Sequence, residues 1–363
     1  MKDKHKAIKR YERNPEKFDV IDFFDTIGRR RQLKLGDEND KSAFVDIVND
    51  SLASNSYDTM IYGKRVEAMF SYVVASLGRC VLVKKEDGGD VFAEDPTIEI
   101  PDYKVVLADN SQMLIEVKNH HPQNVFAEYS MDTEYIRGLS KYANVMNTDL
   151  KIAVYWSKMS LWTLLSANDF EVKGRKSTIS MGKAMKRNQM SVLGDVFIGT
   201  TTPLAIRYYA DKTQKNYIDI DVKGSDNRFT AEITLGEVEI LCSGNVITNS
   251  NEQRIASALM AFGYLEEKCV VEMLDDTSQV EYLECSYNPI EDNDNPDNCC
   301  IVGVLSTIIS RQYGQLTAPN GKVERLSPDI DPGLLGFIIP DDYQSADLPL
   351  WRFHMEANFD DEF

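Results

Sequence analysis

The feature that most constrains the fold is a pair of apolar segments at residues 100–119, IPDYKVVLADNSQMLIEVKN. Residues 102–107 and 112–118 are rich in β-branched and other apolar side chains, and the polar tetrad ADNS between them is typical of a turn. Three charges lie at one end of this predicted hairpin. Asp102 begins the first strand, and Glu116 and Lys118 end the second. Charges that are partly buried need partners that offset the loss of water.

The length of the turn decides whether these three charges meet. Glu116 and Lys118 point to the same face of their strand, because side chains alternate along a strand. A two-residue turn would pair Asp102 with position 117 and place it on the opposite face. A three-residue turn pairs Asp102 with position 116 or 118 and brings the three groups together. We therefore predict an odd-numbered loop or a bulge within 108–111.

Two carboxylates and a lysine on one face are suited to phosphodiester hydrolysis with a metal ion. Mg²⁺ (or Mn²⁺) prefers carboxylate oxygens and keeps sites open for water and substrate phosphate. Asp102, Glu116 and the backbone carbonyl of Val117 are the predicted metal ligands. Lys118 could orient or deprotonate the attacking water, or neutralise charge on phosphorus.

A fourth candidate, Glu67, lies on a helix predicted over residues 57–77. Apolar residues recur there at intervals of three and four, and Gly78 follows as a C-cap. Phe70 and Val74, three and seven positions after Glu67, face the predicted core. Glu67 therefore borders the buried face and can reach the sheet edge that carries Asp102.

This set of residues resembles the PD-(D/E)xK nuclease superfamily, nearest to its branch of Holliday-junction resolvases and Mrr-type restriction endonucleases. The similarity covers about residues 57–160 and depends on Gly63, Glu67, Gly78, Pro101-Asp102 and Glu116-Val117-Lys118. It implies a restriction endonuclease-like α/β fold with a mixed sheet flanked by helices. It also implies that the acids matching Asp102, Glu116 and Glu67 hold the metal and that Lys118 assists the water.

Two features depart from the family pattern. The loop at 86–99 is longer and more acidic than in small resolvases. No glutamine–tyrosine signature follows the motif, although Tyr135 and Tyr142 lie on the next predicted helix.

Each half of the motif is common in this chain. Glu-Val-Lys recurs at 171–173, Asp-Val-Lys occurs at 221–223, and Pro-Asp occurs at three other places. Only Asp102 precedes an acid-x-Lys tripeptide by the length of a hairpin, with a helical glutamate upstream. The alternative interpretation is an ordinary surface hairpin with charged ends.

The order of predicted elements favours a mixed sheet with helices on both sides. A strand at 80–85 precedes the hairpin, and a helix at 131–146, a strand at 150–156 and a helical turn at 160–166 follow it. Four alternating segments after residue 200 indicate strands, and helices are predicted at 252–266 and 299–310. The predicted organisation is an N-terminal helical or extended arm (1–56), a nuclease core (57–199), a β-rich accessory domain (200–290) and an acidic C-terminal region (291–363), the last two forming a mixed α+β part.

Charge is distributed unevenly. The net charge of −18 argues against a protein that coats nucleic acid without sequence preference, because such binding needs a basic surface. Residues 291–363 hold 14 acids and four bases, whereas residues 173–187 hold six bases and no acid. We expect this basic segment to bind the phosphate backbone of nucleic acid. The alternative is a solvated helix face, which could pair with acidic segments of the same chain. The bases of the segment are Lys173, Arg175, Lys176, Lys183, Lys186 and Arg187.

The six cysteines form no CxxC pair, and the chain has only four histidines, so a structural zinc site is not expected. We predict buried thiols in a reducing compartment. No apolar run approaches the roughly 18 residues that span a bilayer, and the N-terminus lacks an apolar signal segment, so the predicted location is cytoplasmic.

The leading hypothesis is a Mg²⁺-dependent endonuclease of a restriction or anti-phage defence system, acting on DNA, with RNA as an open alternative. Its C-terminal half would serve regulation or assembly. We expect a homodimer or a larger complex, with a co-encoded protein partner as one form of it. The alternatives are a structure-specific junction or repair nuclease and a catalytically silent scaffold subunit that binds a protein partner.

Overall fold

A five-stranded mixed sheet organises the first half of the chain. The structure is a computed structural model that describes residues 6–360 except 12–13, 54–57, 125, 214–216, 222–227, 275–278, 291–298, 338 and 341. The sheet order is β1-β2-β3-β5-β6, and only the β3–β5 pair is parallel. Its strands are β1 (Cys80–Lys85), β2 (Tyr103–Leu107), β3 (Gln112–His120), β5 (Asp149–Trp156) and β6 (Leu161–Ser166).

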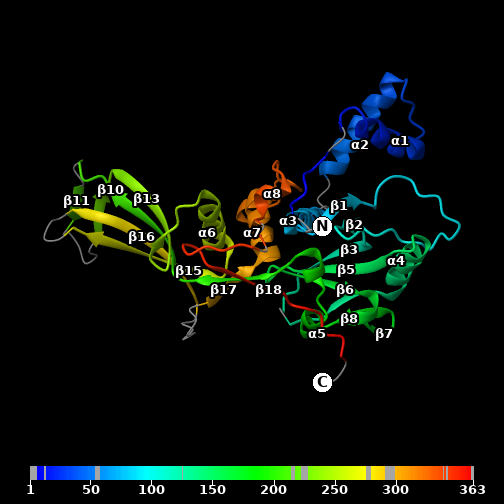
Figure 1. The fold of residues 1–363 in the computed structure, drawn as a ribbon. Coiled ribbons are helices and arrows are strands. Elements are labelled where there is room, and N and C mark those ends of the chain that lie inside the picture. The colour runs from blue at the N-terminus through cyan, green and yellow to red at the C-terminus, as the bar shows by residue number, and fades with distance from the viewer. Residues whose placement is uncertain are drawn as a thin grey trace.

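Helices cover both faces of this sheet, as the order of elements predicted (Figure 1). Alternation along β3 sends Ile115 and Val117 into one apolar cluster with Phe70 of α3 (Asp58–Leu77). The opposite face carries Ile152 and Val154 of β5, which pack in a second cluster with α4 (Thr133–Val145). The predicted C-cap is confirmed, since Gly78 follows α3 with φ of 88°.

A small sheet and a short helix extend the α4 side. The sheet order is β4-β8-β7, with β4 (Tyr129–Asp132), β7 (Glu171–Lys173) and β8 (Lys176–Ile179). Helix α5 (Met181–Lys186) follows β8, and the Ser180 side chain caps it by accepting from the backbone N–H of Lys183. Short 3₁₀ turns lie at Ala167–Asp169 and Met190–Leu193.

The N-terminal arm contains two helices, α1 (Asp19–Arg31) and α2 (Glu38–Ala53), which lie beside the mixed sheet (Figure 1). They pack on each other through Phe24 and Phe44, whose ring centroids are 4.9 Å apart. No residue of α2 is buried. The arm therefore adds little to the main core.

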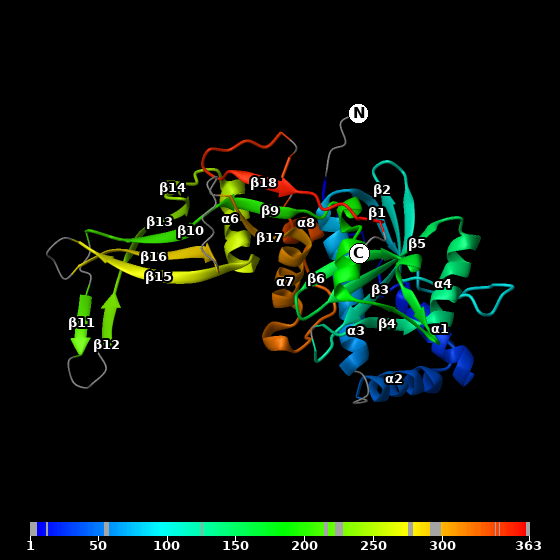
Figure 2. The ribbon, with the colours of Figure 1, turned by 90° about the horizontal axis from the view of Figure 1, so that it is seen from below.

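The second half of the chain forms an elongated blade that extends away from the mixed sheet (Figures 1 and 2). Its main sheet has the order β14-β13-β10-β16-β15, and β11 pairs with β12 beyond it. The strands are β10 (Leu204–Ala210), β11 (Tyr217–Asp221), β12 (Arg228–Glu232), β13 (Leu235–Cys242), β14 (Asn245–Val246), β15 (Leu265–Met273) and β16 (Val280–Pro289).

Elements from the acidic C-terminal region join the blade to the half that contains the five-stranded mixed sheet. The sheet β17-β9-β18 comprises β9 (Phe197–Thr201), β17 (Cys299–Val304) and β18 (Leu350–Phe353), beside the helices α6 (Ser250–Phe262), α7 (Leu305–Thr317), α8 (Pro332–Leu335) and a 3₁₀ turn at Pro319–Gly321. Helix α7 packs on α3, where the rings of Tyr313 and Tyr72 are 5.4 Å apart. One apolar cluster runs from Phe70 through Ile198 to Ile308. The predicted boundary between residues 199 and 200 falls within β9. The division of the chain into domains remains a prediction.

Two predicted helices are wrong. Where a helical turn was predicted at 160–166, Leu161–Ser166 form strand β6, whose Leu164 and Leu165 are fully buried on opposite faces. A short strand buried on both faces has no period-2 alternation, so the pattern could not separate it from a helix. Residues 299–310 contain a strand, β17, before helix α7 begins at Leu305.

The prediction that all cysteines are buried thiols is also wrong. Cys269 and Cys285 form a disulfide between β15 and β16, and Cys269 is exposed. The two residues are separated by 16 positions and meet only because the strands pair in this register. Residues 291–298, at the start of the predicted acidic C-terminal region, lie outside the described residues. Among the residues described, no helix has the length and apolar character needed to cross a bilayer.

Candidate active site

The turn between β2 and β3 has the predicted odd length. Tyr103 pairs with Ile115, and the Leu107 N–H donates to the Ser111 carbonyl over 2.9 Å, which leaves residues 108–110 as the loop. Asn110 closes the loop with φ of 68°, a conformation that asparagine tolerates. The Asp109 carboxylate accepts from the backbone N–H and the hydroxyl of Ser111 at 2.9 and 2.6 Å. The register therefore places Asp102 opposite Glu116.

Asp102, Glu116 and Lys118 come together at one end of the hairpin. Asp102 is 6% exposed and Glu116 is 1% exposed, so both carboxylates lie in the protein interior. The Val117 N–H donates to Asp102 Oδ2 over 2.8 Å, which fixes that carboxylate against β3. The Lys118 ammonium contacts Glu116 Oε1. The three predicted residues thus form one cluster, and turn parity is the reason.

The electrostatics of the cluster favour a bound cation. Burial, and then the nearby charge of Glu116, raise the pKa of Asp102 to about 7, and Glu67 adds to the rise. The Val117 hydrogen bond and Lys118 act in the opposite direction. Lys118 alone therefore does not compensate for two buried carboxylates.

The two oxygens of Glu116 differ in their surroundings. Oε1 accepts from the Tyr135 hydroxyl over 2.7 Å and contacts Lys118. Oε2 is buried and has no hydrogen-bond partner. A buried carboxylate oxygen without a donor is costly unless a cation fills the position. The donors here are all hard oxygens, the type that Mg²⁺ and Mn²⁺ take.

Tyr135 is a site residue whose contact was not predicted. It lies in the first turn of α4, and the Lys118 ammonium is 4.9 Å from the centre of its ring. Burial and Glu116 raise the pKa of Tyr135, so its hydroxyl stays protonated and can only donate to the carboxylate. Its place at the start of the next predicted helix was the only available signal.

Glu67 lies on α3, and its predicted position at the border of the buried face is observed. Its side chain is 19% exposed, and its carboxylate lies 2.7 Å from the ammonium of Lys64, one helical turn earlier. The Tyr103 hydroxyl donates to the Glu67 carbonyl over 3.1 Å, which ties α3 to β2 at this end of the sheet. Lys64, which also lies 3.8 Å from Asp87, is a second cation that the motif did not indicate.

The basic segment does not form one open surface. Lys173 lies 3.1 Å from Glu128, and Lys176 lies 3.8 Å from Asp132. Arg187 is 8% exposed and 3.9 Å from Asp169. These contacts match the alternative in which the bases pair with acids of the same chain. Arg175 and Lys183 are respectively exposed and partly exposed.

The C-terminal tail lies against α5. The Lys186 ammonium donates to the Asp360 carbonyl over 2.7 Å, and the Asn358 N–H donates to the Lys186 carbonyl over 2.9 Å. The Arg187 guanidinium lies 5.3 Å from the centre of the Phe359 ring. A ligand of α5 that uses these two bases would therefore meet the tail first.

Comparisons with known proteins add little. No family model matches the chain, and no curated protein matches it. Among solved structures, the chain is similar to Hjc of the archaeal hyperthermophile Archaeoglobus fulgidus, a Holliday junction resolvase. The match has 14% identity and a TM-score of 0.30, and it covers 37% of this chain and 96% of the resolvase. A TM-score of 0.30 is too low to assign a function, so the proposed function depends on the geometry of the site.

Proposed function

We propose that the protein is a metal-dependent nuclease with a restriction endonuclease-like core that hydrolyses phosphodiester bonds in DNA. The observation that carries the proposal is the convergence of Asp102, Glu116 and Lys118, with one oxygen of Glu116 buried and unpartnered. A surface hairpin with charged ends would leave these groups in water. Here two carboxylates are buried side by side, which is unfavourable unless a cation binds between them.

The donor set fits Mg²⁺ or Mn²⁺. Asp102, Glu116 and the Val117 carbonyl would hold the ion, and Glu67 would complete the set from α3. When bound, such an ion supplies positive charge for the phosphate and lowers the pKa of water. Lys64 now neutralises Glu67, so a metal ion would have to compete with Lys64 for that carboxylate.

The residues of the chain have separate tasks in the proposed reaction. Lys118 is 31% exposed at its side chain, so its ammonium can reach a water or a phosphate oxygen at the mouth of the site. It would orient the attacking water and stabilise negative charge that develops on phosphorus. Tyr135 holds Glu116 in place by donating to Oε1. Val117 holds Asp102 in the same way through its N–H.

The substrate and setting are further parts of the proposal. Internal cutting of DNA in a restriction or anti-phage defence system fits a nuclease core joined to a large accessory blade. The blade would contribute to recognition or assembly. A homodimer or larger complex would place two sites on the two strands of a duplex. Fold alone does not decide among these roles.

Cutting of plasmid DNA tests the enzymatic part. The purified chain is incubated with supercoiled plasmid, with Mg²⁺, Mn²⁺ or EDTA. We expect metal-dependent nicking or linearisation that Glu116→Gln and Lys118→Met each reduce by at least about 100-fold, the size expected for loss of a group that stabilises transition-state charge. Glu171→Gln is the matched control, because Glu171 belongs to a second Glu-Val-Lys whose three residues are exposed on β7. Equal cutting by the variants and the wild type would refute the site.

The choice of substrate separates the alternatives. Linear duplex, single-stranded DNA, a four-way junction and RNA are tested in parallel under the same metal conditions. Preference for the junction would favour a structure-specific nuclease. A chain that binds Mg²⁺ in a Glu116-dependent manner but cuts none of these substrates, alone or with a co-encoded partner, would favour the scaffold hypothesis.

A further inference from the structure

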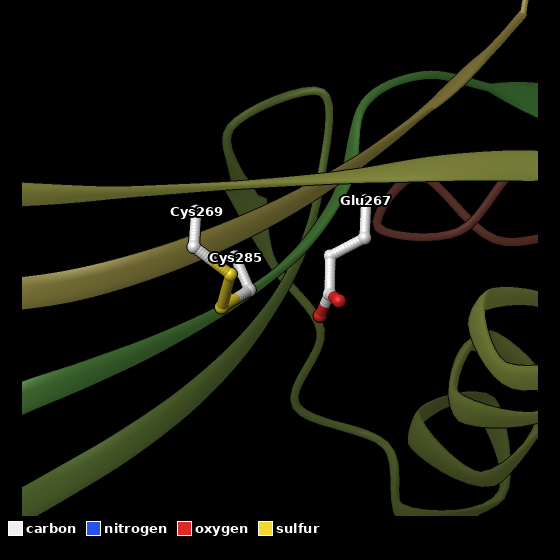
Figure 3. Close-up of side chains that lie close together, drawn as sticks. All are labelled: Glu267, Cys269 and Cys285. Carbon is white, nitrogen blue, oxygen red and sulfur yellow. A yellow bond between two sulfur atoms is a disulfide. The ribbon is translucent and has the colours of Figure 1, made fainter.

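Two cysteines and a glutamate share one face of the β15–β16 ladder, in the blade. Cys269 lies directly opposite Cys285 in the antiparallel register, and their Cα atoms are 4.0 Å apart. Glu267 precedes Cys269 by two residues, so strand alternation sends its side chain to the same face. Figure 3 shows the disulfide with the Glu267 carboxylate on the same side of the two strands. The two sulfurs and a carboxylate oxygen all lie within 4.8 Å of one another.

The carboxylate is held in place. Tyr287 lies opposite Glu267 on β16, and its hydroxyl donates to Glu267 Oε1 over 2.6 Å. Lys268, between Glu267 and Cys269, points to the opposite face and does not compete for the carboxylate. A hydrogen bond that orients a ligand is a common feature of protein metal sites.

We propose that the reduced Cys269–Cys285 pair and Glu267 form a binding site for Zn²⁺ or a similarly thiophilic divalent cation, and that the disulfide is its closed state. A thiol reductant transfers two electrons and two protons to the disulfide, which yields two protein thiols and the oxidised reductant. Binding of the cation then displaces the two thiol protons. Two thiolates and one carboxylate leave a fourth tetrahedral position for water.

Both states join the edge strand to its neighbour where the blade has little other support. Helix α6 packs on the base of this sheet, where Ile206, Ile240 and Tyr287 contact the main core. Further along the same face, Val271 of β15 is 40% exposed. A disulfide or a shared cation at Cys269–Cys285 holds β15 at the limit of this covered region. How firmly β15 is held to β16 therefore depends on the redox state of the two cysteines and on whether the cation is bound.

Metal titration of the full chain tests the inference without using nuclease activity. Cd²⁺ is the probe, because thiolate coordination gives a charge-transfer absorption. We expect reduced protein to bind one equivalent with this absorption and to release about two protons. We expect protein with the disulfide intact to show no such absorption. Each of Cys269→Ser and Cys285→Ser should abolish it, while Glu267→Gln should weaken binding by about 10-fold or more.

The control and the outcomes that would overturn the proposal follow from the other cysteines. Cys80, Cys242, Cys299 and Cys300 are not part of the disulfide, and Cys299 is the most accessible of these four. Cys299→Ser should leave the absorption unchanged. Equal absorption in reduced wild type and in the Cys269→Ser/Cys285→Ser double variant would overturn the site. Unchanged affinity in Glu267→Gln would overturn the three-ligand form. Circular dichroism of each variant under reducing conditions checks that the sheet is retained.

Discussion

Replacing Asp102 by Asn should stabilise the metal-free protein while removing its nuclease activity. The carboxylate is 6% exposed and faces Glu116, and its pKa rises from an ordinary 3.8 to about 7. Asn keeps the shape, and its amide oxygen can still accept from the Val117 N–H, which Ala would leave unsatisfied. The neutral amide removes the cost of burying an ionised group beside a second carboxylate.

The magnitude follows from linkage. At about 1.4 kcal/mol per pH unit, a rise of about three units costs the folded state about 4 kcal/mol at pH 8, which is an upper limit for the gain in Asp102→Asn. A raised carboxyl pKa means that the folded state binds more protons than the unfolded state. Wild-type stability should therefore fall as pH rises from about 4 through about 7. The difference between variant and wild type should grow from under about 1 kcal/mol at pH 4 toward this limit at pH 8.

Urea unfolding in EDTA at pH 4, 5, 6, 7 and 8 measures this difference. Glu171→Gln serves as the control, because it neutralises an exposed acid and should change the free energy of unfolding by less than about 0.5 kcal/mol. Added Mg²⁺ should stabilise the wild type and leave Asp102→Asn unchanged, since only a state that binds the ion gains from it. If Asp102→Asn were less stable than the wild type at pH 8, or if the difference did not depend on pH, the reasoning about a strained carboxylate pair would be refuted.

Two further predictions concern Tyr135 and the C-terminal tail. Tyr135→Phe removes the 2.7 Å donor to Glu116 and should weaken Mg²⁺ binding, measured by calorimetry, by about 10- to 100-fold. Tyr142→Phe, on the same helix, removes a hydroxyl that donates to Glu86 at the end of β1 and should not weaken it. Deletion of residues 355–363 uncovers Lys186 and should raise affinity for duplex DNA and steepen its salt dependence, measured by fluorescence anisotropy. Unchanged affinity after the deletion would show that the tail does not compete with DNA.

Local rules predicted the parts of the structure that depend on neighbouring residues. The α3 helix follows from its three- and four-residue periodicity, and the meeting of Asp102 with Glu116 follows from the parity of a turn. The prediction of a helical turn at residues 160–166 was wrong because a strand that is buried on both faces has no alternation of apolar and polar residues. The contact of Tyr135 with Glu116 depends on how α4 docks on the sheet. That docking is a tertiary event with no short-range pattern.

The disulfide and the contact between the tail and α5 were not predicted, for a related reason. Cys269 and Cys285 are 16 residues apart, and Lys186 and Asp360 are 174 residues apart. Charge counting correctly described residues 173–187 as basic and the C-terminal region as acidic. It could not decide whether the two would meet each other or a nucleic acid. Only the fold, which brings the tail back to α5, supplies that information.

The main chain of Asp102 explains why the turn can control the site so strictly. Its carbonyl accepts from the Glu86 N–H over 2.8 Å at the end of β1, while its side chain accepts from Val117 on β3. Asp102 is therefore fixed from both neighbouring strands and cannot swing to correct a register error. Insertion or deletion of one residue in the 108–110 loop would shift the register, so that position 102 would lie opposite a residue whose side chain points to the other face. The three-residue loop is thus as much a part of the candidate active site as the charged groups that it aligns.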